Sequence, residues 1–149
     1  MKPIRIYLDM CCLQRPMDDQ AHMRIHIEAE AILGILAWCE AGNADLLNSV
    51  ALEYEADHNP HPSRKAFVQE VLSKSVFTVQ ATDSVKQRTQ HFGKFGIKVL
   101  DSLHLACAVE AKATYFCTCD DRFLRRAKQM NTKTTKVVSP LELIEGIEP

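Results

Sequence analysis

Four acidic residues are the candidates for chemistry in this chain: Asp9, Glu55, Asp101 and Asp120. Asp9 and Asp120 directly follow short apolar segments, and Glu55 comes two helical turns after a third one. Asp101 lies in the first turn of an apolar helix, where its side chain points back toward the N-terminal end. If the apolar segments are parallel strands, these positions meet at one edge of a sheet, where α/β proteins bind their ligands.

Four carboxylates at one edge predict a divalent cation, because like charges that close together are costly unless a cation neutralises them. Ligand sets made only of oxygen favour Mg²⁺ or Mn²⁺ over zinc. Such an ion lowers the pKa of a bound water and stabilises the departing oxygen of a phosphodiester. We expect the cation to be held chiefly by Asp9, Asp101 and Asp120. An Asp after a strand is also a common N-cap, so Asp9 taken alone favours a structural role.

The elements that must position these acids alternate between strands and helices. Apolar and β-branched segments predict five strands, at residues 4–8, 45–48, 76–79, 114–118 and 136–138. Helical patterns predict helices at about residues 20–41, 49–58, 62–72, 82–92 and 99–111, and two more that begin near residues 123 and 139. Residues 10–19 are predicted to form a loop. The alternation predicts a three-layer α/β/α sandwich with a central parallel sheet of four or five strands, in a single domain of residues 1–149. The helix over residues 99–111 is apolar nearly all round and should be among the most buried elements.

Composition and charge narrow the function classes. The hydrophobic and charged fractions, 46% and 25%, are ordinary for a globular protein. No apolar run reaches membrane-spanning length, and the N-terminus lacks the order of a signal peptide, so we expect a cytoplasmic protein with no membrane partner. None of the six cysteines forms a C-x-x-C pair, which argues against a zinc site: Cys11, Cys12, Cys39, Cys107, Cys117 and Cys119.

A basic segment follows the fourth predicted strand, although the net charge of the chain is −1. Within fifteen residues it holds six cations and, after Asp121, no acid: Arg122, Arg125, Arg126, Lys128, Lys133 and Lys136. This segment could hold phosphate groups. A solvated helix face explains it equally well.

The acidic motifs together resemble those of the PIN-domain family of metal-dependent ribonucleases, which includes the toxins of VapBC-type toxin–antitoxin pairs. The resemblance spans residues 4–123, and the order and spacing of its four motifs carry it: residues 6–9, 49–55, 100–108 and 116–123. It implies an α/β/α sandwich and an acidic Mg²⁺ or Mn²⁺ site that hydrolyses RNA. It also implies an RNA substrate, an antitoxin protein as a partner, and a homodimer.

Residue by residue, the resemblance matches Asp9, Asp101 and Asp120 to the first, third and fourth acids of the family, with Thr118 before the last. It makes Asp9, Glu55, Asp101 and Asp120 the catalytic residues, and Asp9, Asp101 and Asp120 the metal ligands. For the second acid, Glu55 fits the interval from Ser49, and Glu53 is the alternative. Asp121 could replace or assist Asp120.

The chain departs from the family pattern at Met10, where many members have a small hydroxyl residue. A hydroxyl there could orient a metal-bound water, and Met cannot. The alternative function is therefore a catalytically weak or inactive PIN-fold module that binds RNA or protein.

Two other protein classes fit the sequence less well. An aspartyl phosphohydrolase needs a second Asp at the position of Cys11, and a receiver domain needs an Asp where Gln80 and Ala81 follow the third strand.

Overall fold

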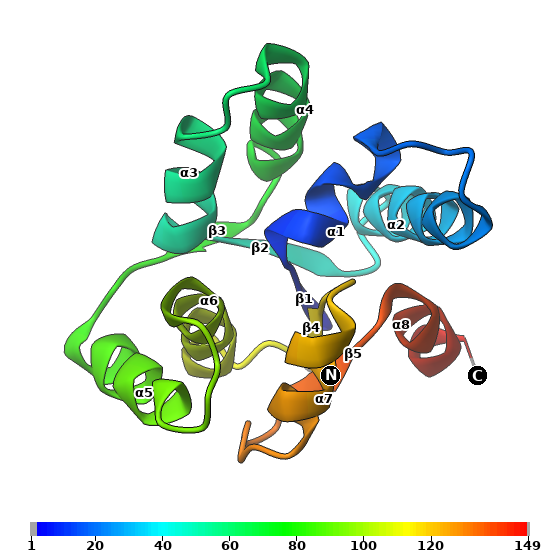
Figure 1. Ribbon diagram of the computed structural model, residues 1–149. Coiled ribbons are helices and arrows are strands. Elements are labelled where there is room, and N and C mark those ends of the chain that lie inside the picture. Colours follow the sequence, from blue (N-terminus) through cyan, green and yellow to red (C-terminus); the bar gives the residue numbers. More distant parts are fainter. Residues whose placement is uncertain (1–2, 149) are drawn as a thin grey trace.

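The computed structural model describes residues 3–148 and shows five parallel strands between two layers of helices (Figure 1). The strands are β1 (Arg5–Leu8), β2 (Asp45–Ser49), β3 (Phe77–Val79), β4 (Tyr115–Cys117) and β5 (Lys136–Val138). Their order across the sheet is β3-β2-β1-β4-β5, and every neighbouring pair is parallel. The predicted three-layer sandwich with a parallel central sheet is confirmed.

The helices occupy both faces of the sheet. They are α1 (Met10–Gln14), the 3₁₀ helix η1 (Arg15–Met17), α2 (Met23–Glu40), α3 (Val50–Asp57), α4 (Pro62–Leu72), α5 (Asp83–Gly93), α6 (Val99–Glu110), α7 (Asp121–Lys128) and α8 (Pro140–Ile147). In Figure 1, α2 and α8 lie on one side of the sheet and pack together, while α5 and α6 lie on the other. Among residues 3–148, no helix combines the length and the apolar character needed to cross a membrane.

The strand order places a topological switch point between β1 and β4. The chain leaves β1 toward β2 and β3, and it leaves β4 in the opposite direction toward β5. Ligands of open parallel sheets bind in the crevice outside the carboxyl ends of the strands at such a point. Asp9 follows β1 and Asp120 follows β4 after two intervening residues, so both acids lie at this crevice.

Helix α6 and strand β1 form the centre of the core. On α6, Leu105, Ala106, Cys107 and Ala108 have no exposed surface, which confirms the predicted burial of this helix. On β1, Ile6, Tyr7 and Leu8 are all fully buried, although the sequence alternates apolar and polar positions. A central parallel strand is covered on both faces, so Tyr7 is buried as well.

The predicted loop over residues 10–19 is wrong, because α1 and η1 lie within it. Asp9 caps α1: its Oδ1 accepts a hydrogen bond of 2.8 Å from the backbone N–H of Met10. Three of the five residues of α1 are buried: Met10, Cys12 and Leu13. Burial of these side chains stabilises a helix too short to show a periodic pattern in sequence. The next helix, α2, begins at Met23, three residues later than predicted.

Candidate active site

Asp9 is the most deeply buried of the four predicted acids, with 5% of its surface exposed. Besides the cap to Met10, its Oδ2 accepts a 3.0 Å hydrogen bond from the hydroxyl of Thr118, and the thiol of Cys11 lies 3.5 Å from it. Burial is the main cause that raises the pKa of Asp9 to about 8. The two hydrogen bonds therefore do not offset the cost of burying this charge, and a nearby cation would.

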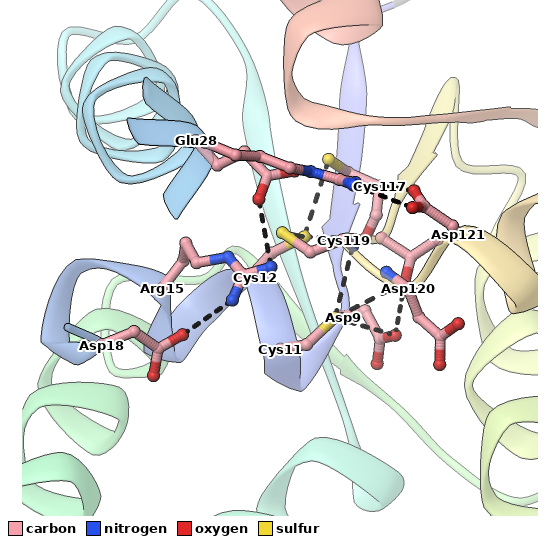
Figure 2. Close-up of polar contacts among 12 residues, drawn as sticks. Asp9, Cys11, Cys12, Arg15, Asp18, Glu28, Cys117, Cys119, Asp120 and Asp121 are labelled. Carbon is pink, nitrogen blue, oxygen red and sulfur yellow. Dashed lines mark hydrogen bonds and ion pairs between the residues drawn. The ribbon is translucent and has the colours of Figure 1, made fainter. Parts of the chain in front are cut away.

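Asp101 and Asp120 lie at the outer side of the same crevice. Asp101 is partly buried in the first turn of α6, and Asp120 is the exposed N-cap of α7, where its Oδ1 accepts from the N–H of Phe123 at 3.0 Å. Burial, and then the charges of Asp9 and Asp120, raise the pKa of Asp101 to about 6. The three carboxylates thus interact electrostatically, and Figure 2 shows those of Asp9 and Asp120 close together and pointing the same way.

Glu55 reaches the same region from α3. Its carboxylate forms a hydrogen bond with Nε2 of His104 on α6. One ligand atom each from Asp9, Glu55 and His104 lies within 4.8 Å of the others. Glu53, the alternative second acid, is exposed and instead lines a separate hollow on the far side of α3 with Asn48. The geometry therefore places Glu55, and not Glu53, beside Asp9.

Asp121 is directed away from the other acids. Its two carboxylate oxygens accept hydrogen bonds of 2.6 and 2.8 Å from the guanidinium of Arg24 on α2. This bidentate pair ties the start of α7 to α2. Asp121 therefore forms a structural contact rather than taking the place of Asp120.

His104 has a central place in the site that the sequence reasoning did not assign. It is fully buried, and its Nδ1 shares a 2.6 Å hydrogen bond with the hydroxyl of Tyr7, which in turn lies 2.6 Å from the hydroxyl of Ser49. Burial lowers the pKa of His104, but the hydrogen bond with Glu55 and the charges of the nearby acids raise it above the ordinary value overall. The signal in the sequence was its position three residues after Asp101, on the same helix face.

The donor set fits Mg²⁺ or Mn²⁺. Asp9, Asp101 and Asp120 offer only carboxylate oxygens, which hard divalent cations prefer. The raised pKa values of Asp9 and Asp101 show that their neighbours do not neutralise the ionised forms. Thr118 also gives Asp9 a hydroxyl partner, so this carboxylate does not depend on residue 10 for one.

Cations surround the outer acids. Asp101 and Asp120 line a cavity of about 140 Å³ together with Lys98, Arg122 and Arg126. A hollow of about 580 Å³ adjoins it, lined by Phe95, Arg122, Arg125, Arg126, Gln129 and Met130. The first part of the basic segment therefore lies at the acidic crevice. Lys128, in the same segment, pairs at 2.6 Å with Glu142 instead.

Comparison with known proteins gives a match in structure but none in sequence. No family model matches the chain, and no curated protein matches it. One similar solved structure is described as VapBC2 from Rickettsia felis bound to a DNA fragment from their promoter. The match has a TM-score of 0.57 at 12% sequence identity and covers 90% of this chain and 98% of that chain. The chain therefore has the PIN-like fold of the VapC type.

Proposed function

We propose that this protein is a metal-dependent endoribonuclease that hydrolyses RNA phosphodiesters at the crevice between β1 and β4. The observation that carries the proposal is one cavity in which Asp101 and Asp120 lie beside Lys98, Arg122 and Arg126, next to the buried Asp9. A phosphodiesterase site needs carboxylates that bind a cation and, around them, cationic side chains that bind a polyanion. Both are present here. The likeness to a VapBC toxin–antitoxin complex supports the same function.

Asp9, Asp101 and Asp120 are the residues that would hold Mg²⁺ or Mn²⁺. When bound, such an ion supplies an activated water and charge stabilisation at the departing oxygen. The N–H of Met10 and the hydroxyl of Thr118 fix the orientation of Asp9. Such partners in the second layer normally set how well a ligand binds its metal.

Glu55 has a different task in this scheme. His104 holds one of its oxygens, and the hydroxyl of Tyr7 holds His104 from the other side. We propose that the second carboxylate oxygen of Glu55 accepts a proton from the attacking water. Arg122 and Arg126, which line the cavity of Asp101 and Asp120, would bind phosphates of the RNA strand.

The test is cleavage of a mixed RNA pool by purified protein with Mg²⁺, with Mn²⁺ and with a chelator. Asp9→Asn keeps the shape of the side chain and removes one charge, so we expect the rate to fall by about a hundredfold or more. Glu53→Gln, on the same helix as Glu55 but outside the crevice, is the matched control and should cleave like the parent. A parent that binds RNA but cleaves none with either metal would overturn the proposal and establish the alternative, a binding module.

The partners follow from the same proposal. We propose an antitoxin protein as one partner, since the similar structure is that of a VapBC pair, and a second copy of this chain as the other. Co-expression with the product of the neighbouring open reading frame tests the first, through co-purification and loss of RNA cleavage. Sedimentation that shows only monomer would contradict the homodimer.

We place the activity in the cytoplasm, where the six free thiols would remain reduced.

A further inference from the structure

Four of the six cysteines gather behind Asp9, at the contact between α1 and the end of β4 (Figure 2). The sulfur of Cys12 lies 3.4 Å from that of Cys119 and 3.8 Å from that of Cys117. The sulfurs of Cys11, Cys12 and Cys119 all lie within 4.8 Å of one another. None of these cysteines is in a disulfide. The usual spacing rule missed the group because its members come from segments more than a hundred residues apart.

The spacing of these sulfurs suits ligands of one ion. Zinc binds thiolate sulfur at about 2.3 Å, so two sulfurs on a tetrahedral ion lie about 3.8 Å apart. The sulfurs of Cys12 and Cys119, 3.4 Å apart, are close to that value, and the sulfur of Cys11 lies within 4.8 Å of both. A disulfide would instead need the sulfurs about 2.05 Å apart, which requires the two segments to move together.

The sulfurs of Cys11 and Cys12 are already held in place. The thiol of Cys11 contacts both the hydroxyl of Thr118 and the carboxylate of Asp9 at 3.5 Å, and that of Cys12 contacts the carbonyl of Cys117 at 3.4 Å. Cys12 is fully buried, Cys119 is 8% exposed, and Cys11 is partly buried. A group held in this way loses little side-chain freedom when an ion binds.

We propose that Cys11, Cys12 and Cys119 bind a thiophilic cation of the zinc type. Soft thiolate ligands select Zn²⁺, Cd²⁺ or Cu⁺, whereas the carboxylates in front of them select Mg²⁺ or Mn²⁺. The chain would thus carry two adjacent metal sites of opposite preference. The Arg15 guanidinium lies beside Cys119 and pairs at 3.0 Å with both Asp18 and Glu28, which it ties to the thiol site.

Occupancy of this thiol site would affect the fold next to the acidic crevice. It joins α1, which Asp9 caps, to the segment that runs from β4 to Asp120. The ion would therefore cross-link the two chain segments that carry the first and last acids. This inference stands on sulfur geometry alone and does not depend on whether the protein cleaves RNA.

The experiment is a titration of fully reduced, metal-free protein with Cd²⁺ in the presence of excess Mg²⁺. We expect an ultraviolet thiolate-to-metal charge-transfer band that saturates at one equivalent and that Zn²⁺ removes by competition. Cys11→Ala and Cys119→Ala should each weaken Cd²⁺ binding by at least about tenfold, and the Cys11→Ala/Cys12→Ala/Cys119→Ala variant should lose the band. Cys39→Ala, a partly buried thiol on α2 outside the cluster, should bind like the parent.

Folding checks and a variant of the acidic site separate loss of the metal ligands from loss of the fold. Alanine keeps the small apolar volume of these buried positions, and circular dichroism checks that each variant is folded. If the triple variant does not fold, the two single variants carry the test, and unchanged Cd²⁺ affinity in both would overturn the proposal. Asp101→Asn should keep the band, because this carboxylate belongs to the other site and contacts none of the three cysteines. The proposal would also be overturned if the reduced parent showed no band. The same holds if mass spectrometry showed a Cys12–Cys119 disulfide, as a loss of two hydrogens, and the protein took up no metal after reduction.

Discussion

The hydroxyl of Thr118 donates a 3.0 Å hydrogen bond to Oδ2 of Asp9, across the crevice between the ends of β4 and β1. This bond lowers the pKa of Asp9 against the larger effect of burial, which raises it. Both atoms are buried, so neither group has water as a substitute partner. Thr118 therefore orients the first acid and favours its ionised form, which a metal requires.

Thr118→Val should remove this bond while keeping the shape of the side chain. The buried oxygen of Asp9 loses a donor, so we expect a loss of about 1–3 kcal/mol in the free energy of unfolding. The pKa of Asp9 should also rise further, which weakens Mn²⁺ binding. Thr135→Val is the matched control, because Thr135 is equally buried and donates at 2.7 Å to the carbonyl of Ala113, away from the acids. Calorimetric titration with Mn²⁺ should show weaker binding for Thr118→Val alone; equal Mn²⁺ affinity in both variants would contradict this role.

The metal-free protein should lose stability as the pH rises from about 4 to about 8. The pKa of Asp9 in the folded chain is raised to about 8, so between these values the folded state binds a proton that the unfolded state has released. Stability then falls by up to about 1.4 kcal/mol per pH unit, and the loss is complete above the folded pKa. Asp101 adds an effect of the same sign up to about pH 6.

Chemical denaturation at several pH values measures this dependence. Asp9→Asn retains the N-cap and has no carboxyl group to titrate, so its stability should depend less on pH and should match or exceed that of the metal-free parent near pH 8. Mn²⁺ should restore stability to the parent at high pH and not to the variant. Parallel pH profiles for the two proteins, with Asp9→Asn less stable throughout, would identify Asp9 as a capping residue only.

Glu55→Gln should reduce RNA cleavage by about a hundredfold to ten-thousandfold, the range expected when a general base is removed. The same change removes the charge that favours protonated His104, so the pKa of His104 should fall. NMR titration of the histidine ring protons measures that shift independently of catalysis. Glu53→Gln, exposed on the same helix, should leave both the rate and the His104 titration unchanged. Equal rates in the two variants would exclude Glu55 from the reaction.

The sequence predicted the elements with strong local patterns and missed those that depend on tertiary contacts. Strand β1 and helix α6 were predictable, because a short apolar segment and a continuous apolar helix have few alternative structures. Helix α1 was not, since five residues are too few for periodicity and its stability comes from three buried side chains.

The candidate site divides in the same way. Asp9 and Asp120 follow strands and Asp101 lies in the first turn of a helix, so parallel topology brings these three acids to one edge. Glu55 lies further along α3. The roles of His104 and Thr118 come from contacts with residues 49 and 109 positions away, and no local pattern encodes such contacts. The choice between Glu53 and Glu55 was open for a related reason: the start of α3 decides which of them faces the crevice.

Arg122→Ala should weaken RNA binding without altering the metal site. Arg122 is exposed, and it lines both the cavity of Asp101 and Asp120 and the larger hollow beside it. If it contacts one RNA phosphate, its loss should raise KM, leave kcat nearly unchanged, and reduce the salt dependence of binding by about one unit of slope.

Lys128→Ala, on the same helix but paired with Glu142, is the matched control and should change neither KM nor the slope. Fluorescence anisotropy with labelled RNA over a range of salt concentrations measures the slope. An unchanged slope for Arg122→Ala, or an equal change for Lys128→Ala, would show that the polyanion does not lie along this cavity.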